Sequence, residues 1–337
     1  MSDNLQNDLQ FGIQTNGIKH THLDLMPDVE TRFSMVKDIG IFDYVDKTPE
    51  LFEIEDFKKS SIKYDIPIRA GGWFYEIGNH KNLLKQNLQT AKDLGSIVHN
   101  TQIQSLNNDG KLVTDIEVRD AYLEAYDIGV KMGVVPCFEV HVNMWSEDFS
   151  RVSKVGNLVE DKGIEFNMTL DHSHVIFKIN NPKEQKIFDI DKKILLGDLI
   201  LDPFKTGNIV DEWINSGWIK HCHARSAIPN NPLNIYGSHP DGSFGRGIQY
   251  PFKKPENDEY HELWESHLLD PWKECIKQLM KYHIKDPKSK LGQISTEFIP
   301  NTDYGEGCKY SLFEQGIECT NWMKDTWQTI KDETQIR

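Results

Sequence analysis

Carboxylates and imidazoles follow four successive apolar segments in the second half of the chain. Each segment is typical of a short buried strand, and the ionisable residues near their ends are Glu139 and His141, Asp171 and His174, His221 and His223, and Glu297. Side chains two apart on a strand point the same way, so Glu139 and His141 are expected to project together. Burying a carboxylate is unfavourable unless it is paired, so these groups need a partner. We predict that this partner is a divalent cation shared by all four segments.

One residue from each segment is the expected metal ligand: Glu139, Asp171, His223 and Glu297. Carboxylates with one imidazole and no thiolate favour a hard cation with five or six ligands. Mn²⁺ fits this set best, while Mg²⁺, Co²⁺ and Zn²⁺ are alternatives. Cys222 lies between the two histidines of "HCH", and strand alternation is expected to turn it into the core.

Helical periodicity separates these segments, and strands and helices also alternate through the first half of the chain. Thr114 and Glu117 have the spacing of a capping box at the start of one helix. The eight predicted strand regions are 11–18, 42–48, 66–78, 96–104, 135–145, 165–174, 218–227 and 291–300. Eight strand–helix repeats predict a single (β/α)8 TIM barrel over residues 1–337. An open, doubly wound sheet is the alternative, but no GxGxxG or P-loop motif follows any predicted strand.

The carboxyl ends of the strands form the active site of such a barrel, which would bring the four segments together. Other residues near the same mouth are expected to contact a substrate. His99 ends the fourth predicted strand, and Trp73, Phe74 and Trp145 offer rings that can stack on a sugar.

Composition restricts the class of substrate. The net charge of −14 repels nucleic acid, and no basic cluster offsets it. No apolar stretch approaches the roughly 18 residues of a membrane span, and the polar start "MSDNLQNDLQ" lacks the pattern of a secretion signal. The five cysteines include no CxxC pair, which indicates reduced thiols. We therefore expect a cytoplasmic enzyme that acts on a small molecule.

The ligand set resembles that of the xylose isomerase-like TIM-barrel superfamily, and the resemblance covers nearly the whole chain. In its ketose 3-epimerase branch, a Glu, an Asp, the second His of an HxH motif and a Glu hold the metal. Here the corresponding residues are Glu139, Asp171, His223 and Glu297. The resemblance also implies that His174 and Arg225 bind substrate, although Arg225 lies closer to the HxH motif than its counterpart in the epimerases.

Residues 226–262 form a segment that is too long for an ordinary strand–helix connection. With the preceding "HAR", it resembles the branch that contains the α subunits of bacterial C-glycoside deglycosidases. The resemblance implies a hetero-oligomer with a smaller β subunit; otherwise we expect a homo-oligomer. We predict that the segment covers the substrate or contacts another subunit.

These observations predict an enzyme that removes a proton next to a sugar carbonyl, with the cation polarising that carbonyl. The lead hypothesis is a C-glycoside deglycosidase catalytic subunit, a carbon–carbon lyase in which His141 is the base and β-elimination releases the aglycone of a 3-oxo-glycoside. The alternative is a sugar isomerase or ketose 3-epimerase that uses Glu139 and Glu297 as acid and base. An apurinic-site endonuclease is a remote alternative. Such enzymes hold three zinc ions with additional ligands from other strands, but the predicted strand 66–78 offers no His, and the acidic surface disfavours DNA.

Overall fold

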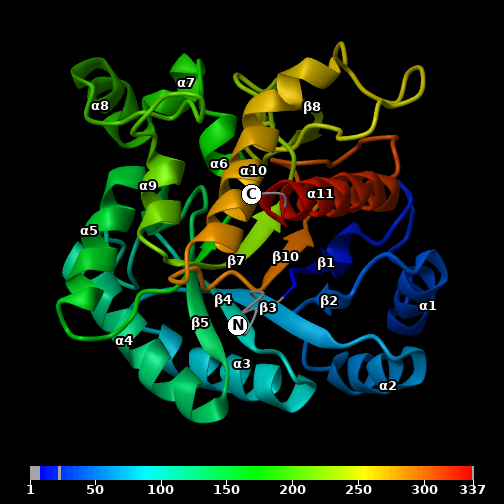
Figure 1. Cartoon of the computed structure of the whole chain (residues 1–337), viewed down its shortest axis with the longest axis horizontal. Coiled ribbons are helices and arrows are strands. Elements are labelled where there is room, and N and C mark those ends of the chain that lie inside the picture. Colours follow the sequence, from blue (N-terminus) through cyan, green and yellow to red (C-terminus); the bar gives the residue numbers. More distant parts are fainter. Residues whose placement is uncertain (1–7, 22–23, 336–337) are drawn as a thin grey trace.

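Eight parallel strands form the closed barrel at the centre of the computed structural model, which describes residues 8–21 and 24–335 (Figure 1). The strands are β1 (Gln10–Gln14), β2 (Tyr44–Asp46), β3 (Ile68–Tyr75), β4 (Val98–Ile103), β5 (Val135–Glu139), β6 (Met168–Leu170), β7 (Ile219–Ala224) and β10 (Gln293–Thr296). They follow one another around the barrel in chain order, and β10 closes it by pairing with β1. The predicted (β/α)8 architecture is confirmed, and only β1 begins outside its predicted region, by one residue.

Helices surround the barrel and connect its strands (Figure 1). They are α1 (Val29–Ile39), α2 (Ile54–Tyr64), α3 (His80–Leu94), α4 (Asp115–Met132), α5 (Phe149–Glu160), α6 (Ser173–Ile176), α7 (Pro182–Gln185), α8 (Ile190–Leu196), α9 (Ile209–Asn215), α10 (Asp270–Lys285) and α11 (Leu312–Gln335), with the 3-10 turns η1 (Thr15–Gly17), η2 (Trp145–Glu147), η3 (Ile187–Asp189) and η4 (Ser266–Leu269). The predicted capping box is confirmed: Thr114 and Glu117 exchange hydrogen bonds at the start of α4. In the described part of the chain, no helix is both long and apolar enough to cross a membrane.

Apolar side chains from the strands and the inner faces of the helices form the main core. Burial of each large apolar side chain contributes about 1.5–3 kcal/mol, so this core is the chief stabilising feature of the barrel. All five cysteines are buried, and none of these described residues forms a disulfide bond. Cys222 belongs to the main core cluster, as strand alternation predicts, and burial raises the pKa of its thiol.

Residues 226–262 contain a second, two-stranded sheet formed by β8 (Asn234–Ser238) and β9 (Phe244–Gly245). In the turn between these strands, His239 lies 2.8 Å from the Oδ1 atom of Asp303, in the loop after β10. The segment therefore reaches across to the carboxyl end of the barrel.

A buried ion-pair network fastens this segment to the barrel. The Arg246 guanidinium, just after β9, donates to Glu147 in η2 and to Glu184 in α7, at 2.5 Å in each case. Lys178 donates to Glu147 at 2.8 Å and is fully buried. Removing one partner of a buried ion pair leaves an uncompensated charge, so such a network resists separation.

Candidate metal centre and active site

A cavity of about 400 Å³ lies at the carboxyl ends of the barrel strands. Its volume falls within the range of about 300–1,000 Å³ that is usual for small-molecule sites. Strand ends and the following loops supply its wall, which includes Asp46, Lys47, Trp73, Phe74, Gln102, His141, His223, Arg225, His239, Glu297 and Tyr304.

Three of the four expected metal ligands converge beside this cavity. The Nδ1 atom of His223, on β7, lies 2.9 Å from Oε1 of Glu139 at the end of β5 and 3.2 Å from Oε2 of Glu297 after β10. Asn100 donates to Oε2 of Glu139 at 2.6 Å, and Gln102 donates to the same oxygen. Burial alone would raise the pKa of Glu139, but His223 outweighs burial and lowers it to about 2. These three residues form a buried group with ligand atoms close enough to hold one metal ion.

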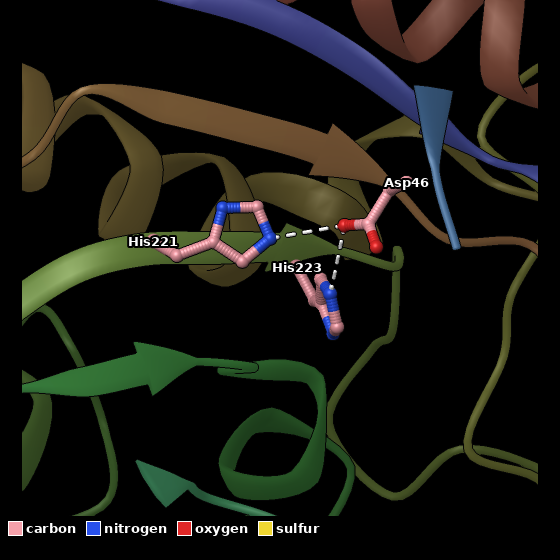
Figure 2. A group of neighbouring side chains, drawn as sticks. All are labelled: Asp46, His221 and His223. Atoms are coloured by element: carbon pink, nitrogen blue, oxygen red, sulfur yellow. Dashed lines mark hydrogen bonds and ion pairs between the residues drawn. The ribbon is translucent and has the colours of Figure 1, made fainter. Parts of the chain in front are cut away.

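Asp46 holds His223 in the orientation that this group requires (Figure 2). Its Oδ2 atom accepts from Nε2 of His223 at 3.2 Å, from Nε2 of His221 at 3.0 Å and from Oγ of Ser295 at 2.7 Å. With Nε2 engaged, Nδ1 of His223 is the ring atom that faces the two glutamates, as a carboxylate partner commonly arranges for a metal-binding histidine. Asp46 was not among the residues predicted from the sequence, although it ends an apolar strand in the same way as Glu139.

Asp171, the fourth expected ligand, lies in an ion pair with Arg225. The Nη1 atom of Arg225 donates to Oδ2 of Asp171 at 2.8 Å, while Nη2 donates to Oε2 of Glu297 at 2.5 Å. The other oxygen of Asp171 accepts from the backbone and the hydroxyl of Ser173. Burial alone would raise the pKa of Asp171, but the nearby Arg225 holds it well below its usual value. A guanidinium therefore lies between two carboxylates that were expected to share a metal.

His141 lies on the cavity wall and outside the group of three ligands. Its Nδ1 atom is 2.5 Å from the carbonyl oxygen of Val142, and a carbonyl can only accept, so Nδ1 carries the hydrogen. In the neutral ring the lone pair is then on Nε2, which lies 3.2 Å from the hydroxyl of Tyr304. Burial raises the pKa of Tyr304, so this hydroxyl stays protonated and donates to His141. Tyr304 lies in the loop after β10, and no pattern in the sequence predicted this contact.

Several solved structures share the fold of this chain, although no protein-family model and no curated protein matches it. The 3-keto-D-glucoside 4-epimerase YcjR from E. coli has a TM-score of 0.52 at 12% identity, covering 94% of this chain and 100% of that chain. D-allulose 3-epimerase from Methylomonas sp. has a TM-score of 0.54 at 11% identity, covering 96% and 99%. The IOLI protein with bound zinc has a TM-score of 0.54 at 12% identity, covering 96% and 99%. The chain has the xylose isomerase-like TIM-barrel fold.

In this xylose isomerase-like barrel, His174 lies behind the cavity wall. It is fully buried, and its Nε2 atom lies 3.2 Å from Oδ2 of Asp171 and 3.3 Å from Nη1 of Arg225. Burial lowers the pKa of His174 to about 4, so the ring is neutral at ordinary pH. His174 therefore supports the Asp171–Arg225 pair, whereas Arg225 itself reaches the cavity.

Two residues that were expected at the mouth of the xylose isomerase-like barrel lie elsewhere. Asn100 and Gln102 line the cavity, and because side chains alternate along β4, His99 points to the opposite face. There it is fully buried, and its Nε2 atom lies 2.7 Å from the hydroxyl of Tyr75. Trp145 is 1% exposed and belongs to the main core. Both positions are corrections to the expectation of substrate contact.

Proposed function

We propose that this protein is a metal-dependent sugar isomerase or epimerase that moves a proton on a carbon next to a carbonyl. The observation that carries this proposal is the convergence of Glu139, Glu297 and Nδ1 of His223 beside a cavity of small-molecule size. The similar solved structures support it, since two of them are sugar epimerases and a third contains zinc.

The ligand chemistry fits a divalent cation. Two carboxylates and one imidazole suit Mn²⁺, Mg²⁺, Co²⁺ or Zn²⁺, and Glu139, His223 and Glu297 would hold the ion. A cation bound there would polarise a carbonyl oxygen and stabilise the negative charge that develops beside it. Asp171 joins the set only if Arg225 releases it, because both of its oxygens are engaged.

His141 and Glu297 are the two groups best placed to take and return the substrate proton. Both line the cavity, where Nε2 of His141 lies 3.2 Å from the hydroxyl of Tyr304, within reach of a group that can exchange protons. Glu139 is more enclosed, because His223, Asn100 and Gln102 all contact its carboxylate. We therefore assign Glu139 to the metal and assign proton transfer to His141 and Glu297.

Isotope exchange tests the proposed proton transfer. The Mn²⁺-loaded protein would be incubated in D₂O with D-fructose, D-allulose and a 3-oxo-glucoside, and the products analysed by NMR. We expect deuterium at the carbon next to the carbonyl of at least one sugar, loss of exchange with EDTA, and recovery with Mn²⁺. Absence of exchange with all three sugars, at full metal loading, would count against the proposal.

A C-glycoside deglycosidase is the second candidate, because His141 lies outside the group of three ligands and faces the cavity. In that reaction His141 would remove a proton beside the 3-oxo group, and the electron pair would form a carbon–carbon double bond as the aglycone leaves the neighbouring carbon. Protonated His141 would then return its proton to the departing aglycone. Residues 226–262 would cover the substrate, since His239 of this segment lines the cavity. Release of free aglycone from a 3-oxo-C-glycoside distinguishes this candidate, which also implies a separate β subunit.

The number of metal ions bound per chain distinguishes the two candidate sugar enzymes from an apurinic-site endonuclease. Elemental analysis of the purified protein should give about one divalent ion per chain for a sugar enzyme. A value near three would favour the nuclease.

A further inference from the structure

Lys47 places a positive charge on the cavity wall without a carboxylate partner in the described part of the chain. It follows the last residue of β2, and its backbone N–H donates to Ala70 at 2.9 Å, which extends the pairing with β3. The side chain is partly buried and lines the cavity. Its Nζ atom donates to Oδ1 of Asn16 at 3.2 Å and forms no ion pair with a carboxylate of the described residues, although Glu53, Glu50 and Asp46 attract the ammonium from farther away.

The other cations at this end of the barrel are paired. Lys178 contacts Glu147 at 2.8 Å, and Arg225 contacts both Asp171 and Glu297. A charge that loses water without gaining a partner is unfavourable, so an unpaired cation on a cavity wall favours an anionic ligand.

Asn16 adds a neutral donor to the same part of the wall. Its backbone N–H donates to the Gln14 side chain at 2.5 Å, which fixes the residue in η1. Because its Oδ1 atom accepts from Lys47, its NH₂ group is available as a donor beside the ammonium. Asn16 and Lys47 both line the cavity that contains His223 and Glu297.

We propose that Lys47 and Asn16 form a subsite for the carboxylate of an acidic sugar. This inference rests on the proposed function and narrows its substrate class from sugars in general to sugar acids. A carboxylate matches one ammonium in charge, whereas a phosphate with nearly two negative charges would favour a second cation. The sugar carbonyl would lie toward His223 and Glu297, and the carboxylate toward β1 and β2.

Calorimetric titration tests the subsite without requiring turnover. D-glucuronate and D-glucose would each be titrated into the Mn²⁺-loaded protein. One charge-assisted contact predicts that the wild type binds D-glucuronate about 10- to 100-fold more tightly than D-glucose. Lys47→Gln should abolish this preference, while Lys47→Arg should retain part of it. Metal content and melting temperature would verify that each variant is folded.

Lys131→Gln is the matched control, since it removes the same charge from an exposed position on α4 and should leave the preference unchanged. Equal binding of the two sugars, no binding of either, or an unchanged preference in Lys47→Gln would overturn the proposal. Tighter binding of D-glucose 6-phosphate than of D-glucuronate would also overturn it, in favour of a phosphate subsite. A Lys47-dependent preference without deuterium exchange, when D-glucuronate is included among the sugars incubated in D₂O, would support the subsite and remove only the proposed reaction.

Discussion

Arg225 donates to Asp171 at 2.8 Å and to Glu297 at 2.5 Å, so its guanidinium joins two carboxylates from opposite sides of β7. All three side chains are largely buried. The proposed metal group uses one of these carboxylates, Glu297, which therefore lies between the guanidinium and His223. This ion pair and the metal group are expected to depend on each other.

Replacing Arg225 with Met should destabilise the metal-free protein by about 3–5 kcal/mol, because two buried carboxylates lose their shared cation. Mn²⁺ should restore more stability to this variant than to the wild type, since the ion can compensate the buried carboxylate charge that Arg225 no longer pairs. Urea unfolding with and without Mn²⁺ measures both effects. Arg119→Met removes an arginine paired with Asp120 on the surface of α4 and should cost at most about 1 kcal/mol. A variant as stable as the wild type would contradict the structural role of Arg225.

Replacing Asp46 with Asn should weaken metal binding about 10- to 100-fold, because the carboxylate that orients His223 is lost. Competition with a fluorescent chelator measures the Mn²⁺ dissociation constant. Ser295→Ala removes one of the three hydrogen bonds to the same Asp46 oxygen and should have a smaller effect in the same direction. Unchanged Mn²⁺ affinity in Asp46→Asn would show that His223 does not need this partner.

Glu147 should make the stability of the protein sensitive to acid. Burial alone would raise its pKa, but Lys178 and Arg246 lower it from 4.5 to about 2. Because the folded-state pKa is depressed, the charge contributes stability above pH 4.5 and loses that contribution as the pH falls towards 2. The shift corresponds to about 3 kcal/mol at neutral pH.

Glu147→Gln should therefore be less stable than the wild type by about 3 kcal/mol at neutral pH, with a difference that shrinks as acid is added. Urea unfolding midpoints from neutral pH down to about pH 3 provide the comparison. Glu314→Gln breaks an exposed pair with Lys253 and should cost at most about 1 kcal/mol. A constant difference between wild type and Glu147→Gln at every pH would contradict the assigned charge.

His141→Ala should slow deuterium exchange by about 10²- to 10⁴-fold, as expected when a general base is removed. Metal content should not change, since His141 is outside the ligand group. Tyr304→Phe removes only the hydroxyl that contacts Nε2 and should have a milder effect. His267→Ala, at an exposed position in η4, is the control. Near-normal exchange in His141→Ala would assign proton transfer to Glu297 alone.

The barrel was predictable from sequence because it follows local rules, and the same rules indicated the strand ends where the candidate site lies. Alternating strand and helix patterns indicated the repeats, and a charged residue at the end of an apolar strand marked Glu139 and Glu297. The same rule applies to Asp46, which ends β2 but was not among the predicted site residues. His99 was expected on the cavity side of β4 but points to the opposite face, because neighbouring side chains alternate along a strand.

The remaining contacts depend on tertiary structure. Tyr304 and Arg246 lie in loops, where no periodicity relates a side chain to the cavity. The pairing of Arg225 with Asp171 joins β7 to the end of β6, and sequence spacing could not distinguish this ion pair from shared metal binding. Whether Asp171 binds a guanidinium or a metal ion depends on the positions of these side chains in the folded protein.

Anomalous diffraction from crystals of the Mn²⁺-loaded protein tests the central claim most directly. We predict one strong manganese peak within bonding distance of Glu139, Glu297 and Nδ1 of His223. A map without that peak, or with manganese only beside Asp46, His221 and Nε2 of His223, would contradict the proposed metal centre.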